Sequence, residues 1–261
     1  MEHDITEVNQ LKQYYYGFYS TNIYLPFSRV SKMWRMFWQK YKEKKERFMQ
    51  RTSLPTVSWK NVLKQSLIRL VEEEKEDGNI RISELGILAQ LSKECEEGSL
   101  IFEIGTFDGR TTVNLAINAP LSCQIFTLDL PPEQATKHQL ASGESHYVDK
   151  PKPGVKYRKY AKIYQNEIAR VSQLLGDSAT YDYQGYINKC ALVFVDGSHA
   201  YDYAKSDSYV AMQLVKMNGC IIWHDYGIWE GVTRAIEDIE REEKLGLKNI
   251  AGTSLVYYKN T

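Results

Sequence analysis

The strongest constraint on the fold is an alternation, from Arg81 to the C-terminus, between short apolar runs and longer stretches with helical periodicity. The apolar runs are continuous, which is typical of strands in a parallel sheet covered on both faces. The predicted strands are 99–104, 124–129, 171–175, 190–195, 220–223 and 254–258. The pattern predicts an α/β, Rossmann-like doubly wound fold with a mostly parallel sheet and helices on both faces.

The segments between these strands carry the apolar spacing of helices. Residues 82–95 and 111–119 are predicted as the first two helices. A third is expected to align Tyr203, Val210, Leu214 and Met217, and a fourth Val232, Ala235, Ile236 and Ile239. Each predicted helix therefore has an apolar face to pack against the sheet.

The N-terminal region differs in character from the rest of the chain. Residues 29–51 hold nine Lys or Arg against two Glu, and aromatic residues recur along one side of a predicted helix. Because the pattern is interrupted near Pro55, we predict a helical extension over 1–54 and the main domain over 55–261. We favour packing of this helix on the main domain or on a second subunit, as in a homodimer, and keep peripheral membrane contact as the alternative.

Composition excludes several classes of protein. With 33 Lys and Arg against 33 Asp and Glu, the chain has no net charge to drive general nucleic-acid binding. No apolar run approaches the roughly 18 residues of a membrane-spanning helix, and the acidic start MEHDITEVNQ is unlike a secretory signal. The four widely spaced cysteines form no CxxC pair and are expected to be reduced thiols. These features together predict a cytoplasmic protein that binds no nucleic acid.

The first predicted strand ends in Glu103-Ile-Gly105 and continues to Gly109 and Thr111. A glycine directly after a strand lets a ligand approach the backbone, although a plain strand-to-helix turn has the same residues. The spacing G-x-x-x-G lacks the middle glycine of the dinucleotide fingerprint. Asp129 ends the next strand, where a carboxylate can accept ribose hydroxyls. A ribose-bearing cofactor without a pyrophosphate fits best, and S-adenosylmethionine is the candidate.

Further polar residues follow the later strands. Gly176-Asp177-Ser178 either borders an adenine or forms an ordinary turn. Asp196 ends the fourth strand, with His199 one turn beyond it, and His224 and Asp225 end the fifth. Adjacent strands lie about 5 Å apart, so these acids and imidazoles are expected to converge. The alternative is that one histidine satisfies backbone groups while one acid is solvated.

The motifs FEIGTFDGRTT, FTLDLPPE, LLGDSATYDY, LVFVDGSHAYDYAKSD and GCIIWHDYG together resemble the class I S-adenosylmethionine-dependent methyltransferases. The nearest resemblance is to the macrocin O-methyltransferase group and its sugar-modifying relatives. It covers roughly residues 82 to 258, and the expected sheet has seven strands.

The resemblance implies roles for individual residues. Glu103 and Gly105 would line the methionine end of the cofactor, with Thr106, Gly109 and Thr111 in the same turn. Asp129 would take the ribose hydroxyls, Asp177 and Ser178 would border the adenine, and Asp196 would lie near the transferred methyl. Metal-dependent members bind Mg²⁺ through acids at the fourth and fifth strand ends, which implicates Asp196 and Asp225. His224 stands where those members often have another acid, and a mixed set also suits Mn²⁺.

The expected activity is O-methylation of a hydroxyl on a small molecule, a sugar or a natural product. Asp196, His199 and His224 are the candidate catalytic residues. Either histidine would act as general base, or a divalent metal on Asp196, His224 and Asp225 would lower the pKa of the hydroxyl, and we favour the metal. The alternatives are a metal-dependent hydrolase or hydroxylase on the same sheet and a non-catalytic scaffold protein.

The polar stretch 131–160 is too long for a simple connection and is expected to form a lid over the substrate. Its basic residues, Lys156 among them, would either attract an anionic acceptor or remain solvated, and solvation is the favoured interpretation.

Overall fold

The structure is a computed structural model that describes residues 52–261 apart from residue 65 and the stretches 72–79 and 149–152. The predicted N-terminal helix lies outside the described residues, so its packing, membrane contact and role in a dimer stay predictions. None of the described helices is both long and apolar enough to cross a membrane.

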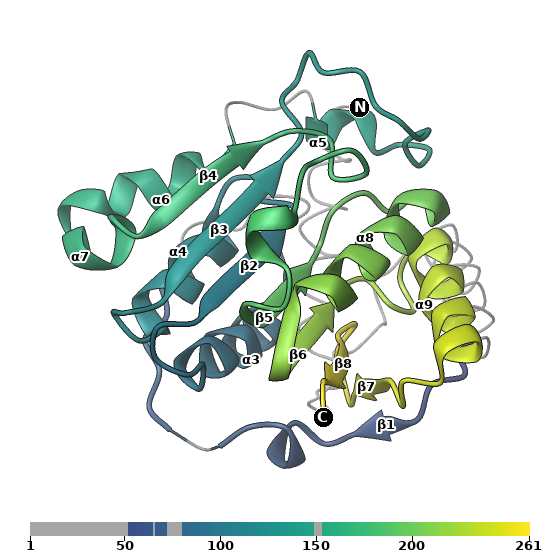
Figure 1. Cartoon of the computed structure of the whole chain (residues 1–261), viewed down its shortest axis with the longest axis horizontal. Coiled ribbons are helices and arrows are strands. Elements are labelled where there is room, and N and C mark those ends of the chain that lie inside the picture. The colour runs from purple at the N-terminus through teal and green to yellow at the C-terminus, as the bar shows by residue number, and fades with distance from the viewer. Residues whose placement is uncertain (1–51, 65, 72–79, 149–152) are drawn as a thin grey trace, which may run out of the picture. The chain divides into compact units, whose positions relative to one another are not determined.

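The described chain folds into an eight-stranded sheet (Figure 1). The strands are β1 (Thr56–Val57), β2 (Leu100–Ile104), β3 (Gln124–Asp129), β4 (Val171–Leu175), β5 (Cys190–Val195), β6 (Val215–Trp223), β7 (Lys248–Ile250) and β8 (Val256–Lys259). Their spatial order is β1-β7-β8-β6-β5-β2-β3-β4. β8 runs antiparallel to both of its neighbours, and the other neighbouring pairs are parallel. The predicted Rossmann-like, mostly parallel sheet is therefore confirmed.

Helices cover both faces of this sheet (Figure 1). The α-helices are α3 (Ile82–Lys93), α4 (Arg110–Asn118), α5 (Ser145–Val148), α6 (Val155–Lys159), α7 (Gln165–Ile168), α8 (Tyr201–Leu214) and α9 (Glu230–Glu243). Three short 3₁₀ turns, η2 (Trp59–Asn61), η3 (Tyr160–Lys162) and η4 (Gln184–Tyr186), complete the described elements. α3 packs on α4, and α8 packs on α9.

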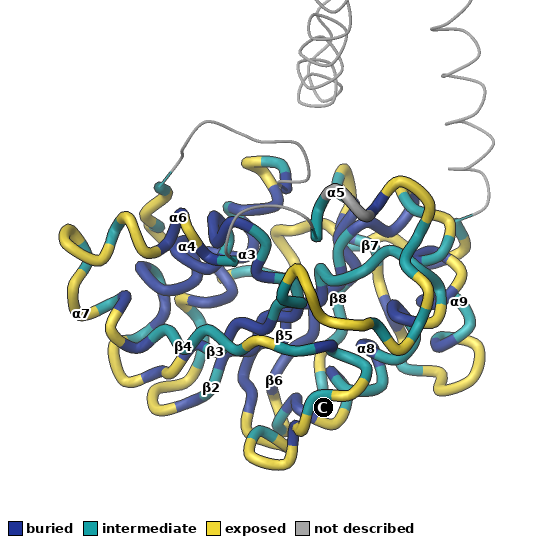
Figure 2. The backbone as a smooth tube through the Cα atoms, turned by 90° about the horizontal axis from the view of Figure 1, so that it is seen from above, coloured by how far each residue is buried: buried dark blue, intermediate teal, exposed yellow. Residues whose placement is uncertain are grey.

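Successive residues of the central strands point to opposite faces of the sheet and pack into two separate hydrophobic cores. In β2, Ile101 joins the core beneath α3 and α4, whereas Phe102 and Ile104 join the core beneath α8 and α9. All six residues of β5 are buried, as its continuous apolar run predicts. Figure 2 shows this burial as dark tube along the central strands, while the α7 turn is exposed. The central strands are thus held rigidly from both sides.

The strand order places a topological switch point between β2 and β5. From β2 the chain proceeds outward through β3 and β4, and then it returns to β5 and continues outward the other way through β6. In such sheets ligands bind beyond the carboxyl ends of the strands beside the switch point. The ends of β2, β3, β4, β5 and β6 therefore define where a site is expected.

The structure differs from the sequence-based expectation in two details. The sheet has eight strands rather than seven because β1 adds to its edge beside β7, and both are too short to show a periodic pattern. The third long helix ends at Leu214 and passes directly into β6, so Met217 lies in a strand and is 66% exposed. Neither glycine nor proline occurs between Tyr201 and Asn218, so the sequence carries no stop signal where the helix ends.

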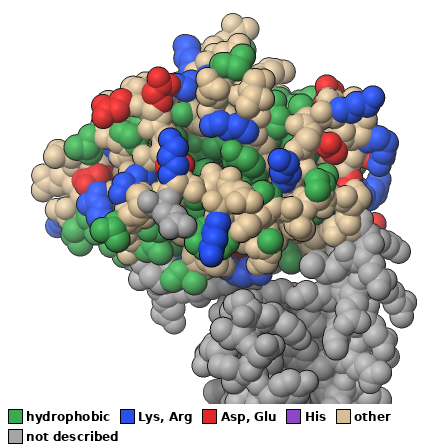
Figure 3. Space-filling model, turned by 90° about the horizontal axis from the view of Figure 1, so that it is seen from below, with side chains coloured by type: hydrophobic (Ala, Val, Ile, Leu, Met, Phe, Trp, Pro, Cys, Tyr) green, Lys and Arg blue, Asp and Glu red, His purple; other side chains and the backbone are tan. Residues whose placement is uncertain are grey.

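Side chains outside the site agree with the composition. The four cysteines form no disulfide, and three of them are buried. On the face drawn in Figure 3, Lys and Arg side chains are spread among apolar and acidic ones instead of forming one continuous patch.

Candidate active site

A cavity of about 290 Å³ opens at the carboxyl ends of β2, β3, β4, β5 and β6. Eight of the residues proposed from the sequence line it, and they come from five separate strand ends. These residues are Gly105, Asp129, Asp177, Ser178, Asp196, His199, His224 and Asp225. The doubly wound topology thus brings together side chains that are up to 120 positions apart in the sequence.

At the switch point, β2 and β5 approach too closely for any side chain. Gly105 has φ +99°, and a Cβ built on it would lie 2.0 Å from the carbonyl oxygen of Asp196. The backbone N–H of Asp196 donates to the carbonyl of Ile104 at 2.8 Å, which fixes this contact. Glycine is required here because both the backbone conformation and the contact exclude a Cβ.

Asp129 closes the turn after β2 from the end of β3. Its Oδ2 accepts a hydrogen bond from the backbone N–H of Phe107 at 2.5 Å. Burial raises the pKa of Asp129 to about 7, although backbone N–H groups around it act in the opposite direction. The carboxyl is held at the cavity wall, where its remaining oxygen can meet a ligand hydroxyl.

Four residues proposed for cofactor binding lie outside the cavity lining. Glu103 is fully buried, and its Oε2 accepts from the hydroxyls of Thr112 at 2.5 Å and Thr127 at 2.6 Å. Burial raises the pKa of Glu103 to about 8 despite these two hydrogen bonds. Thr106 is hydrogen-bonded to Thr127, while Gly109 caps α4 with φ +87° and Thr111 lies in its first turn. These residues stabilise the turn after β2, of which Gly105 and Phe107 line the cavity.

Asp177 organises the loop at the end of β4. Its Oδ2 accepts from the backbone N–H of Lys137 at 2.6 Å, and its Oδ1 accepts from that of Ala179 at 2.9 Å. Tyr183 donates its hydroxyl proton to the carbonyl of Ser178. Asp177 and Ser178 line the cavity, and both oxygens of Asp177 already hold backbone in place.

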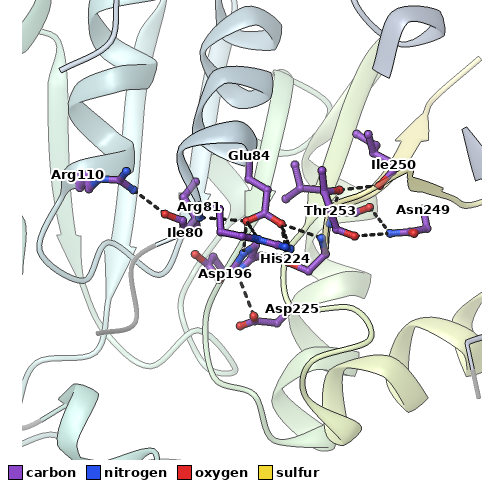
Figure 4. Close-up of polar contacts among 12 residues, drawn as sticks. Ile80, Arg81, Glu84, Arg110, Asp196, His224, Asp225, Asn249, Ile250 and Thr253 are labelled. Carbon is purple, nitrogen blue, oxygen red and sulfur yellow. Dashed lines mark hydrogen bonds and ion pairs between the residues drawn. The ribbon is translucent and has the colours of Figure 1, made fainter. Parts of the chain in front are cut away.

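The predicted convergence of the fourth and fifth strand ends is present. His224 Nδ1 lies 2.9 Å from Asp196 Oδ1 and 3.3 Å from Asp225 Oδ1. His224 Nε2 faces the other way and lies 3.4 Å from Glu84 Oε2 (Figure 4). Asp225 has φ +64°, a strained conformation that Asp tolerates better than most residues and that strain-bearing functional sites often contain.

His199 approaches the same carboxylate from the other side. Its Nε2 lies 2.7 Å from Asp225 Oδ2, and its Nδ1 lies 2.9 Å from Glu144 Oε1. The imidazole stacks on Trp229 with 4.3 Å between ring centroids and 8° between ring planes. Both histidines are therefore bracketed by carboxylates on their two nitrogens.

This bracketing sets the charge of the cluster. Burial lowers the pKa of His199, but Asp225 and Glu144 outweigh burial and raise it to about 10. Asp196 and Asp225 likewise raise the pKa of His224 well above its usual value in spite of burial. The carboxylates therefore favour the protonated form of both rings, and a doubly protonated imidazole has no lone pair with which to accept a proton.

Asp196, His199 and Asp225 can also hold a metal ion. Each offers one ligand atom, and these atoms lie within 4.8 Å of one another. Two carboxylates and an imidazole fit Mn²⁺ or Zn²⁺, while Mg²⁺ prefers oxygen alone. His224, which the sequence placed among the ligands, lies outside this group, with one nitrogen toward the acids and the other toward Glu84.

Two carboxylates of the site were missed by the sequence analysis. Glu84 is buried in the first turn of α3, where a glutamate ordinarily signals only a capping box. Glu144 lies in the stretch 131–160, whose sequence shows no period. Neither residue carries a sequence signal for the site, and only its contact with a histidine in the folded structure identifies it.

The stretch 131–160 contributes a wall of the cavity through Leu140, Glu144, Tyr147 and Val148. Lys156, one of its basic residues, is buried and forms an ion pair with Asp108 at 2.9 Å. This lysine is therefore neither solvated nor directed at the cavity.

Comparisons with known proteins agree with this fold. Residues 102–226 match the family described as a methyltransferase domain. The O-methyltransferase NovP superposes with a TM-score of 0.50 at 13% identity, covering 69% of this chain and 80% of its own. A protein of Corynebacterium glutamicum gives a TM-score of 0.50 at 12% identity, covering 70% and 82%. No curated protein sequence matches the chain.

Both structural matches show the fold, and the family match spans β2 to the end of β6, which carry most of the cavity. A glycine turn after the first long strand and an acid at the end of the next are held in this domain as a ribose-bearing cofactor requires. Residues 102–226 thus match a methyltransferase domain, in agreement with the predicted resemblance to the class I S-adenosylmethionine-dependent methyltransferases.

Proposed function

We propose that this protein transfers the methyl group of S-adenosylmethionine to a hydroxyl of a small molecule, a sugar or a natural product, with help from a divalent metal. The observation that carries the proposal is the convergence of Asp196, His199 and Asp225 in the cavity that also contains Asp129. One cavity thus offers a place for the donor and a charged group that acts on the acceptor. NovP, described as an O-methyltransferase, supports oxygen as the acceptor atom.

The chain's own residues divide the work. Asp129 would bind the ribose and Gly105 would let the cofactor lie against the backbone, which their positions in the cavity lining support. Transfer requires the hydroxyl to lie in line with the sulfonium methyl at about 3 Å, and we assign Asp196, which lines the same cavity, to that end. A divalent ion on Asp196, His199 and Asp225 would supply Lewis acidity that lowers the pKa of the hydroxyl. The flanking carboxylates favour the protonated form of both histidines, which cannot act as a base, whereas a bound ion would displace the proton from His199, so we favour this route over an imidazole base.

The cavity lining is partly apolar. It includes Leu140, Tyr147, Val148 and Trp229, and the rings of Tyr147 and Trp229 contact His199. Flat aromatic surfaces next to polar groups suit a ring-containing acceptor that presents one face to the wall and a hydroxyl to the cluster. This combination supports a sugar or a cyclic natural product over a small acyclic alcohol.

The first experiment is calorimetric titration with S-adenosylmethionine and S-adenosylhomocysteine. We expect binding by the wild type, weaker binding by Asp129→Asn, and unchanged binding by Asp182→Asn, which alters an exposed acid outside the cavity lining. Absence of binding, combined with tight retention of a transition metal, would favour a metal-dependent hydrolase or hydroxylase instead.

The second experiment tests the acceptor and the metal. Transfer of labelled methyl to a panel of sugars and phenols identifies the acceptor class. Turnover should be lost in EDTA and restored by Mn²⁺ or Mg²⁺. Asp225→Asn should also abolish turnover, because it removes a carboxylate of the proposed metal site. The variant should still fold, since Asn tolerates the left-handed backbone at this position. Unchanged turnover in chelator would eliminate the metal route.

A further inference from the structure

Glu84 is a fully buried carboxylate at the far side of the cluster, in the first turn of α3. Its Oε1 accepts from the backbone N–H of Ser254 at 2.7 Å, from the Ser254 hydroxyl at 2.9 Å and from Arg81 Nη2 at 2.6 Å. Its Oε2 accepts from the Arg81 backbone and Nε, both at 3.1 Å, and lies 3.4 Å from His224 Nε2 (Figure 4). A buried carboxylate is costly to desolvate, and these partners offset that cost.

Most of these contacts have a structural explanation. The bond from the Arg81 backbone is half of a capping box, and the bonds from Ser254 attach the turn between β7 and β8 to α3. The contact with His224 belongs to neither purpose. It reaches from a helix over one face of the sheet to a side chain at the carboxyl end of β6.

His224 can keep its orientation only if both of its nitrogens are satisfied. Its Nδ1 meets Asp196 and Asp225, and its Nε2 meets Glu84, while the ring is only 10% exposed. Rotation of the ring by half a turn would exchange nitrogen for carbon at both ends and break both contacts. Glu84 is the partner on the side away from the cavity, so it selects the rotation in which Nδ1 faces the acids.

We propose that Glu84 is a positioning residue that holds the His224 ring so that Asp196 and Asp225 are correctly placed for the cation and the acceptor. His224 then holds the two carboxylates in position through its Nδ1, while His199 is the third ligand of the metal. The anchoring stands on geometry alone, and its consequence for the cation rests on the metal-assisted function proposed above. Partners behind metal-site side chains commonly change metal affinity 10- to 100-fold when they are removed.

The test compares Glu84→Gln with Ser254→Ala. Ser254→Ala removes a hydrogen bond to the same carboxylate but leaves the His224 contact, so it is the matched control for loss of stability. The first readout is the proton NMR signal of the His224 ring N–H facing Glu84, assigned by its absence in His224→Asn. The second is the affinity for Mn²⁺ alone, measured by calorimetry.

We expect the wild type to show an exchange-protected ring proton. Glu84→Gln should shift or lose it and weaken Mn²⁺ binding at least 10-fold, while Ser254→Ala should keep the signal and bind Mn²⁺ within twofold of the wild type. A wild type without a protected ring proton overturns the anchoring even if Glu84→Gln does not fold. Equal losses of Mn²⁺ affinity in both variants would reduce Glu84 to a structural residue. A wild type that shows the ring proton but binds no Mn²⁺ refutes the metal part of the proposed function and of this proposal, and leaves the anchoring standing.

Discussion

Substitution of Gly105 by alanine tests the close approach of β2 to β5 on which the site depends. The new Cβ would lie 2.0 Å from the Asp196 carbonyl oxygen and 2.5 Å from its carbon. Because both atoms belong to the backbone, no side-chain rotation can relieve the clash, and the end of β5 must shift. Left-handed backbone costs a non-glycine residue roughly 1–2 kcal/mol, and overpacking typically costs about 1–3 kcal/mol. We therefore expect Gly105→Ala to lower the free energy of unfolding by about 2–5 kcal/mol.

Two other glycines separate these two contributions. Gly98 has φ +75° and nothing within 4 Å of its built Cβ, so Gly98→Ala should show the backbone contribution alone, about 1–2 kcal/mol. Gly185 has neither a positive φ nor a neighbour within 4 Å, so Gly185→Ala should be near neutral or slightly stabilising. Urea unfolding of the three variants gives the differences directly. The same samples, titrated with S-adenosylhomocysteine, should show weaker binding in Gly105→Ala only.

Equal destabilisation by Gly105→Ala and Gly98→Ala would refute the reasoning. The strand ends would then not touch as described, and the glycine at position 105 would serve backbone conformation only. Weakened cofactor binding without extra destabilisation would point instead to contact between the cofactor and the glycine itself.

Further predictions concern buried charge. Asp129→Asn should weaken S-adenosylhomocysteine binding about 10-fold in calorimetry, the loss of about one charge-assisted hydrogen bond, whereas Glu133→Gln at an exposed position should not. Burial raises the pKa of Glu103 from 4.5 to about 8, so the fold loses stability as pH rises between these values. Glu103→Gln should remove that loss. In urea unfolding, its free energy of unfolding relative to the wild type should rise by a few kcal/mol between pH 5 and pH 8.5, at about 1.4 kcal/mol for each pKa unit. A difference that does not change with pH would contradict this prediction. Lys156→Met should cost about 3–5 kcal/mol by removing the cationic partner of the buried Asp108, with partial recovery in Lys156→Met/Asp108→Asn, as a double-mutant cycle would show.

The sheet was predictable because its strands are buried on both faces. The run 190–195 is apolar throughout, and all six residues are buried in β5. In α9 the predicted face of Val232, Ala235, Ile236 and Ile239 is the buried one. Local pattern determines these elements, since each residue's environment follows from its own helix or strand period.

The site was predictable only up to the strand ends. Topology alone places Asp196 beside Asp225, because parallel neighbours end at the same edge. The partners of the histidines, Glu84 and Glu144, come from segments 140 and 55 positions away along the chain. Their sequence contexts, a helix N-terminus and an aperiodic loop, are compatible with plain solvation. Lys156 shows the same limit, since its burial depends on a long-range ion pair rather than on composition.

The charges at the sheet edge explain how a chain with no net charge can carry an acidic cavity. His199 lies between Glu144 and Asp225, and His224 lies between Glu84 and the pair Asp196 and Asp225. Each histidine links a carboxylate of the sheet edge to one from another segment, so these contacts also attach those segments to the strand ends. The stretch before α5 is fixed in this way, because Glu144 also accepts from the hydroxyl of Ser198 and the backbone N–H of His199. A cation at Asp196, His199 and Asp225 would therefore bind to carboxylates whose positions are fixed by His224 and Glu84. These two residues can support the site without touching substrate.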